Sequence, residues 1–158
     1  MNVGIIGLGN PLRGDDAIGI VLLHRLQAKK KKTWRAFSFI DAGTGGLTIL
    51  HDLSDFTHVL FIDAIDFQST PGQHHVFSAN DILTSPVLPT TVSTHEPDLF
   101  TVIRLSSQMG TLPKVVKIFG VQPATLDYRT GLSPQVTGQV EELTKTLVSL
   151  LDQLPRLH

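Results

Sequence analysis

The fold of this chain is decided by the stretch Gly7-Leu8-Gly9-Asn10-Pro11-Leu12-Arg13-Gly14-Asp15-Asp16-Ala17-Ile18-Gly19-Ile20. It follows an apolar run at residues 3–8 and leads into a helical pattern at about residues 16–30, so it predicts a strand, a glycine turn and a helix. In an open α/β sheet, the loops that leave the carboxyl ends of the strands line the binding crevice. Asp15 and Asp16 are therefore expected at the functional edge of a sheet.

Apolar runs and helical patterns alternate along the rest of the chain. The runs rich in β-branched and aromatic residues predict strands near residues 3–8, 36–40, 58–62, 75–77 and 115–121. Helical patterns lie at about residues 16–30, 46–54, 95–108 and 134–154. The last has Ser133 as its expected N-cap and Pro134 in its first turn, whereas residues 78–94 have the composition of a loop. This alternation predicts an α/β fold with a largely parallel sheet and helices on both faces.

Length and composition exclude several classes of protein. The chain has 158 residues, which fits one domain over residues 1–158. With 13 basic and 14 acidic residues, its formal charge of -1 offers no field for nucleic acid or an anionic membrane. There is no cysteine, no basic segment before an apolar one at the start, and no apolar run near the roughly 20 residues of a spanning helix. A soluble, cytoplasmic protein is expected, and a monomer, because no apolar stripe is left over.

Four consecutive lysines, residues 29–32, close the first predicted helix. A cationic run suits the carboxyl end of a helix dipole, and beyond it such a run usually stays in water. A solvated run is the favoured interpretation, and a docking patch is the alternative.

Three common catalytic motifs are absent. Gly7-x-Gly9 follows a strand, but the third glycine of the dinucleotide-binding fingerprint is replaced by Leu12. The G-x-S-x-G elbow of serine hydrolases does not occur. His95-Glu96 begins like the zincin H-E-x-x-H motif, but the fifth position is Leu99.

What remains is a set of acidic and imidazole side chains at predicted strand ends and helix starts. Asp16 follows the first strand, Asp63 ends the apolar run at residues 59–62, and His95 lies in a possible capping box, Ser93-x-x-Glu96. Two carboxylates and one imidazole suit a divalent metal such as Ni, Zn, Mn or Fe and leave coordination positions open.

Each candidate ligand also has a purely structural interpretation. Either Asp15 or Asp16 could cap the first helix, but only one of them can do so. Asp63 could end its strand by starting an Asx turn. His95 could be a surface histidine.

The same residues carry a resemblance to a known family. The matching segments, in order, are Gly7-x-Gly9-Asn10-x-Leu12-x-x-Asp15-Asp16-x-x-Gly19, Asp41-Ala42-Gly43-Thr44-Gly45-Gly46, Ile62-Asp63-Ala64, Thr94-His95, Gly120-Val121-Gln122-Pro123 and Gly131-Leu132-Ser133-Pro134-Gln135-Val136. Together they cover nearly the whole chain and resemble the hydrogenase maturation endopeptidases, which trim a C-terminal peptide from nickel-iron hydrogenase large subunits. Two departures are mild: Ala42 stands where the family often has glycine, and Asp16 stands where some members have glutamate.

This resemblance implies a three-layer α/β/α sandwich similar to the phosphorylase/hydrolase-like group, with Asp16, Asp63 and His95 as metal ligands. The metal implied is nickel already installed in the precursor, for which Zn or Cd can substitute in vitro. Asp41 and the loop Gly43-Thr44-Gly45 would help to select the substrate. Asp41 is also a candidate general base, because no serine or cysteine nucleophile is visible.

Two other functions are weighed against this one. The opening Gly7-Leu8-Gly9-Asn10-Pro11 also resembles peptidyl-tRNA hydrolases, but residues 13–19 hold no histidine and add negative charge unsuited to a tRNA backbone. The second alternative is an assembly factor that senses nickel through the same three ligands without cutting.

Overall fold

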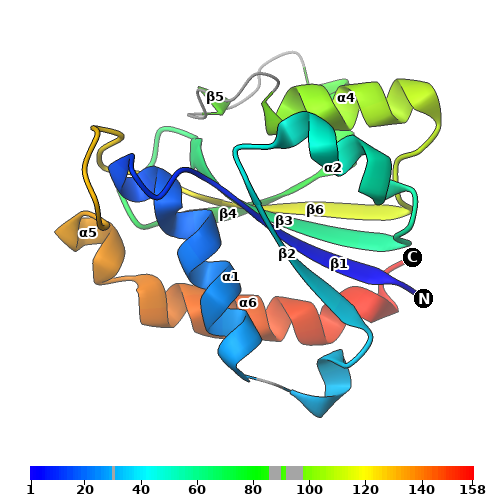
Figure 1. Cartoon of the computed structure of the whole chain (residues 1–158), viewed down its shortest axis with the longest axis horizontal. Helices are drawn as coiled ribbons and strands as arrows, with labels where there is room; N and C mark the ends of the chain where they lie inside the picture. Colours follow the sequence, from blue (N-terminus) through cyan, green and yellow to red (C-terminus); the bar gives the residue numbers. More distant parts are fainter. Residues whose placement is uncertain (30, 86–89, 92–97) are drawn as a thin grey trace.

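The computed structural model describes residues 1–29, 31–85, 90–91 and 98–158. Its centre is a six-stranded sheet in the order β2-β1-β3-β6-β4, with β5 paired to β3 (Figure 1). The strands are β1 (Val3–Leu8), β2 (Phe37–Gly43), β3 (His58–Asp66), β4 (His74–Ser78), β5 (Thr90–Thr91) and β6 (Val115–Val121). Strands β2, β1, β3 and β6 are mutually parallel, and β4 and β5 are antiparallel to their neighbours. The predicted, largely parallel sheet is confirmed.

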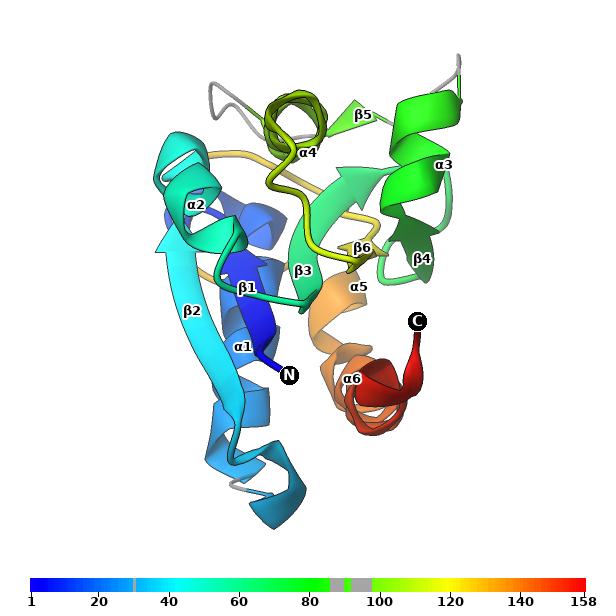
Figure 2. The ribbon, with the colours of Figure 1, turned by 90° about the vertical axis from the view of Figure 1, so that its right-hand side faces the viewer.

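Helices cover both faces of this sheet (Figure 2). They are α1 (Ile18–Lys29), α2 (Gly46–Leu53), α3 (Ala79–Thr84), α4 (Leu99–Met109), α5 (Pro134–Thr137) and α6 (Val140–Gln153), with short 3-10 turns at Gly14–Ala17, Lys32–Trp34 and Leu154–Arg156. Side chains of α1 and α6 pack in one apolar cluster with Ile5 and Leu60. Side chains of α2, α3 and α4 pack in a second cluster with Ile6 and Phe61. Because successive strand residues point to opposite faces, these two clusters make the expected three-layer sandwich.

Two helical segments differ from the sequence-based prediction. The helix expected over residues 134–154 is broken into α5 and α6 at Gly138 and Gln139, although Ser133 caps α5 as predicted, with its hydroxyl accepting from the Val136 N–H. Residues 78–94 were expected to be a loop, which is wrong at α3 and at β5, whose two residues pair with the end of β3. At α3 the Ser78 hydroxyl accepts from the Asp81 N–H, and the Asp81 carboxylate accepts from the Ser78 N–H. This reciprocal capping box stabilises a short helix inside a polar stretch.

Replacing Ser78 by alanine is expected to lower the free energy of unfolding by about 1 kcal/mol, the usual effect of losing an N-cap hydroxyl. The loss leaves the Asp81 N–H without its hydrogen-bond acceptor at the start of α3. Urea unfolding of the variant and the parent protein measures the difference. Ser54→Ala, at an exposed serine just beyond the end of α2, is the control and should change stability by less; an equal effect would contradict the role of the capping box.

Within the described segments, no helix combines the length and the apolar character needed to cross a membrane.

Candidate active site

Two glycines of the opening motif let the start of α1 rest directly on the sheet. A Cβ atom on Gly19 would lie 2.2 Å from the carbonyl oxygen of Leu8 and 2.3 Å from that of Ile62, so only glycine fits between α1 and strands β1 and β3. At Gly9, whose φ is 145°, a Cβ would lie 2.0 Å from the carbonyl oxygen of Asp16. The motif therefore brings the turn after β1 against the carboxyl ends of both strands.

Asp15 is fully buried and holds two distant loops together. Its carboxylate accepts hydrogen bonds from the N–H groups of Ala124 (2.8 Å) and Thr125 (3.2 Å) and from both the N–H and the hydroxyl of Ser133 (2.7 Å each). In Figure 1 this later segment passes beside the start of α1. Asp15 is thus an anchor for residues 124–133, and its interpretation as a helix cap is wrong.

Asp16 and Asp63 come together, as their places after β1 and within β3 predict. Both are buried, with exposed fractions of 0% and 1%. Asp16 Oδ2 accepts a hydrogen bond from the Asn10 N–H (2.9 Å), and Asp63 Oδ1 accepts one from the Ala64 N–H (2.9 Å). Burial raises the pKa of Asp63 well above its usual value, and the negative charge of Asp16 raises that pKa further.

The Asx turn considered for Asp63 occurs three residues later. Strand β3 continues through Asp63 to Asp66, whose Oδ1 accepts a hydrogen bond from the Gln68 N–H at 3.0 Å. Asp66 therefore makes the turn, and Asp63 stays inside a buried strand. The structural interpretation of Asp63 as the start of an Asx turn is therefore wrong.

His95 and the capping box expected at Ser93 lie outside the described residues, so the third proposed ligand has no described position. Among the residues that the structure describes, no group of three or more His, Asp or Glu side chains is placed to hold a metal. Helix α4 begins at Leu99, with Asp98 as its N-cap. Asp98 also raises the pKa of Asp63 through its negative charge, so the start of α4 acts on the acid pair.

The proposed substrate loop lies at the same edge of the sheet. The Gly9 N–H donates to the carbonyl oxygen of Gly43 (2.9 Å), which joins the turn after β1 to the end of β2. Gly43 has a φ of 50°, a conformation that favours glycine. The exposed carboxylate of Asp41 accepts from the Gly43 N–H (3.0 Å) and lies 3.5 Å from Nε2 of His24. Asp41 is thus accessible to water and partly held by its own loop.

Two residues at this edge have roles that the sequence analysis did not identify. Gln122, at the end of β6, accepts hydrogen bonds from the N–H groups of Phe67 (2.9 Å) and Ser69 (3.2 Å) and donates to Asp66 (3.2 Å). His24 of α1 pairs with Asp41. For Gln122, the sequence offered one indication, since the segment Gly120-Val121-Gln122-Pro123 resembles the family. For His24 it offered none, because Asp41 becomes its neighbour only in the folded protein.

The raised pKa of Asp63 predicts a pH-dependent cost to stability. Above the usual carboxyl value of 3.8, the unfolded chain releases this proton while the folded protein retains it, so the contribution of Asp63 to stability falls as pH rises through that window. Asp63→Asn is therefore expected to raise Tm by several degrees at neutral pH. The gain should vanish below about pH 3.8, where both states bind the proton. Thermal unfolding across pH measures this, and a pH-independent gain would contradict it.

Comparison with known proteins agrees with this geometry. The model of the hydrogenase maturation protease family, HycI, matches residues 20–150. Among curated proteins, the chain is 28% identical over 153 residues to the hydrogenase 2 maturation protease of Escherichia coli (strain K12), covering 96% of this chain and 91% of that protein.

Solved structures give the same result. The hydrogenase maturating endopeptidase HybD from E. coli superposes with a TM-score of 0.80 at 25% identity, over 97% of this chain and 93% of that one. The [NiFe] hydrogenase maturation protease HycI from Thermococcus kodakarensis KOD1 superposes with a TM-score of 0.72 at 26% identity, over 96% and 92% of the two chains. The fold, the acid pair at its carboxyl edge and the family match over most of the chain lead to one conclusion: this protein belongs to the hydrogenase maturation protease family and is a peptidase.

Proposed function

We propose that this peptidase removes the C-terminal extension from the precursor of a nickel-iron hydrogenase large subunit after nickel has been inserted. The observation that carries the proposal is the pair of buried carboxylates, Asp16 and Asp63, delivered by the turn after β1 and by β3 to one edge of the sheet. Two negatively charged carboxylates this close together and shielded from water repel each other strongly unless a cation or a bound proton reduces the repulsion.

The donor set fits a divalent metal. Carboxylate and imidazole groups both suit nickel, and zinc or cadmium should occupy the same ligands in vitro. We assign Asp16, Asp63 and His95 as the ligands. Asp98, three residues after His95 in the chain, acts electrostatically on Asp63, which favours bringing His95 to the acid pair. The nickel belongs to the precursor, so these ligands dock onto the substrate's metal.

Peptide hydrolysis adds a water oxygen to the carbonyl carbon, breaks the C–N bond and moves a proton to the leaving nitrogen. A divalent metal can polarise the scissile carbonyl or lower the pKa of a nearby water. Asp16 and Asp63 hold the metal-bearing end of the precursor against the sheet edge. Asp41 is our candidate for the base that takes the proton of the attacking water, because its carboxylate is exposed at the same edge.

The loop Gly43-Thr44-Gly45 is our candidate for the surface that binds the extended tail of the precursor. It joins β2 to α2 beside the turn after β1, with which it shares the hydrogen bond between Gly9 and Gly43. Glycines at this place let a peptide backbone approach closely. We also propose that the reaction takes place in the cytoplasm, with which a chain without cysteine is compatible. We propose that the protein acts as a monomer.

The test is to incubate the purified protein with nickel-loaded and with metal-free large-subunit precursor and to measure the mass of the precursor over time. We expect loss of the C-terminal peptide from the nickel-loaded form only. Equal trimming of both forms would overturn the dependence on nickel. Nickel-dependent binding without any loss of mass would favour the alternative of a nickel-sensing assembly factor.

A further inference from the structure

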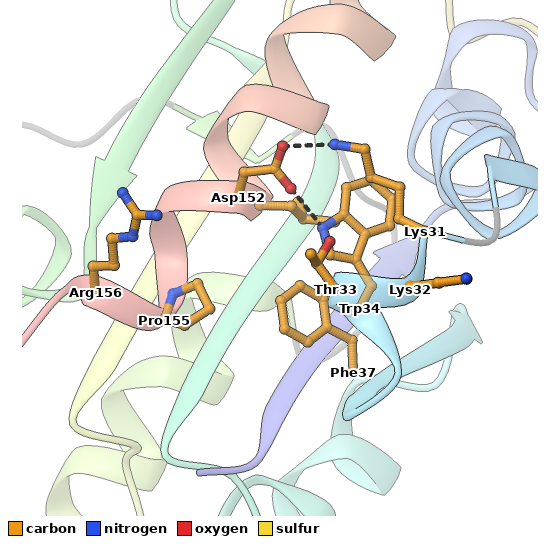
Figure 3. A pocket seen from close by; sticks show the side chains of 9 residues that line it. Lys31, Lys32, Thr33, Trp34, Phe37, Asp152, Pro155 and Arg156 are labelled. Atoms are coloured by element: carbon orange, nitrogen blue, oxygen red, sulfur yellow. Dashed lines mark hydrogen bonds and ion pairs between the residues drawn. The ribbon is translucent and has the colours of Figure 1, made fainter.

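Lys31, one of the lysines that close and follow α1, contacts a distant helix. Nζ of Lys31 donates a hydrogen bond to Asp152 of α6 at 2.6 Å and lies 5.1 Å from the ring centroid of Trp34. The indole Nε1–H of Trp34 donates to the other oxygen of Asp152 at 2.8 Å. Figure 3 shows these three side chains as one connected group. Lys31 therefore departs in part from the solvated interpretation, because its side chain is 37% exposed and is held by Asp152 and Trp34.

This group forms one wall of an open pocket of about 610 Å³. The other lining residues include Lys32, Phe37, Leu151, Pro155 and Arg156. In Figure 3, Phe37 and Pro155 lie in the middle, with Lys32 and Arg156 at opposite sides. The pocket is thus an open hollow with an apolar centre between two cations.

The electrostatics of the pocket favour an anionic partner. Three of its lining residues are cationic, and Asp152 is its one acid. The hydrogen bond from Lys31 holds the pKa of Asp152 below its usual value, so Asp152 stays charged and keeps Lys31 and Trp34 in place. In the described part of the chain, no carboxylate oxygen lies within 4.0 Å of a side-chain nitrogen of Lys32 or Arg156. Arg156 acts on Asp152 only through its charge, which lowers the pKa of that carboxyl further. Both cations are exposed and can pair with a ligand, although the whole chain has a formal charge of -1.

The pocket lies far from the candidate active site. Phe37 begins strand β2, and Gly43, in the proposed substrate loop, ends it. Seven residues of extended strand span about 20 Å. A ligand in the pocket therefore cannot touch the bond that is cut, but a folded partner protein of ordinary size can contact both places at once.

We propose that this pocket is a second docking site for the precursor protein, which binds a surface segment with an apolar side chain between acidic residues. The apolar side chain covers Phe37 and Pro155, and the acidic groups pair with Lys32 and Arg156. The proposal rests on the proposed function, since it names the same substrate. A peptide is a better fit than nucleic acid or an anionic membrane, because two cations beside an apolar floor on a chain of charge -1 give no broad positive field.

The experiment measures the Kd of the nickel-loaded precursor for a Lys32→Glu/Arg156→Glu variant. Both changes are made in an Asp16→Asn background, which is intended to prevent cleavage during the measurement. We expect Kd to rise about tenfold at low ionic strength and by less at high salt, because exposed charge pairs are screened. The matched control is Lys114→Glu/Lys145→Glu, which makes the same change in net charge at exposed lysines outside the pocket and should leave Kd nearly unchanged.

Equal weakening of binding by the two double variants would overturn the proposal, since it would reflect net charge alone. Unchanged binding by the Lys32→Glu/Arg156→Glu variant would also overturn it. Thermal unfolding verifies that both variants fold. Cleavage by the protein with native Asp16 is measured in parallel. If the parent protein cleaves the precursor and the Lys32→Glu/Arg156→Glu change alters neither binding nor cleavage, the proposed function stands and the docking site is excluded. If binding depends on these two residues but no cleavage occurs, the docking site stands and the proposed function is excluded.

Discussion

Replacing Asp15 by alanine is expected to lower the free energy of unfolding by about 3–5 kcal/mol. The carboxylate is fully buried and accepts four hydrogen bonds, from the N–H groups of Ala124, Thr125 and Ser133 and from the Ser133 hydroxyl. Alanine would leave these donors without their acceptor in a place that water does not reach easily. Urea denaturation monitored by circular dichroism measures the change.

Asp15→Asn should also destabilise the protein strongly. The amide keeps one acceptor oxygen but turns an NH₂ group toward N–H donors, so part of the network is lost and part becomes repulsive. Asp127→Ala is the control, because Asp127 lies in the same later segment but is exposed. Its effect should stay within about 0.5 kcal/mol. A loss below about 1 kcal/mol for Asp15→Ala would mean that water or another group satisfies the donors.

The hydrogen bonds of Asp15 could not be predicted from the sequence. The partners of Asp15 are 109 to 118 residues away along the chain, and no local pattern specifies such a contact. Asp16 and Asp63 could be placed together because topology alone brings the ends of parallel strands to one edge. Adjacent carboxylates at residues 15 and 16 thus have different roles, and only tertiary structure separates them.

The strands were predictable for a physical reason. Strands of a parallel sheet covered on both faces are nearly continuous apolar runs, and β1, β3 and β6 have this character, with almost every residue buried. The extension of β3 to Asp66 was not predictable, because the buried Asp63 and the partly exposed Asp66 interrupt the apolar pattern that identifies such a strand.

The helices show where local rules are insufficient. Helix α3 has six residues and lies in a stretch with loop-like composition, where its Ser78 and Asp81 capping box was overlooked. The periodicity of residues 136–154 is that of one helix, yet the helix is interrupted at Gly138 and Gln139. Gln139 packs against Gly72, where a Cβ would lie 2.7 Å from the Gln139 side chain. A contact between distant segments therefore lies at the place where the periodic pattern is interrupted.

Replacing Asp16 by asparagine is expected to reduce the rate of precursor cleavage by at least about 100-fold while the protein remains folded. Asparagine preserves the shape and one oxygen, so Oδ1 can still accept the hydrogen bond from the Asn10 N–H. It removes the negative charge that a divalent metal requires of a carboxylate ligand. Asp63→Asn and His95→Ala should have similar effects. The measurements are single-turnover cleavage of nickel-loaded precursor and calorimetric titration with Zn²⁺ and Cd²⁺.

The control is Asp66→Asn, three residues after Asp63 on the same strand, whose oxygen can still accept from Gln68 and Gln122. It should cleave at nearly the rate of the parent protein. Asp63→Asn gives the sharpest result. The variant should be more stable at neutral pH, because asparagine is neutral without binding a proton on folding, and yet it should lose cleavage and metal binding. A more stable but inactive variant cannot be explained by misfolding. Near-normal cleavage by Asp16→Asn and Asp63→Asn would show instead that the acid pair is not the site of the reaction.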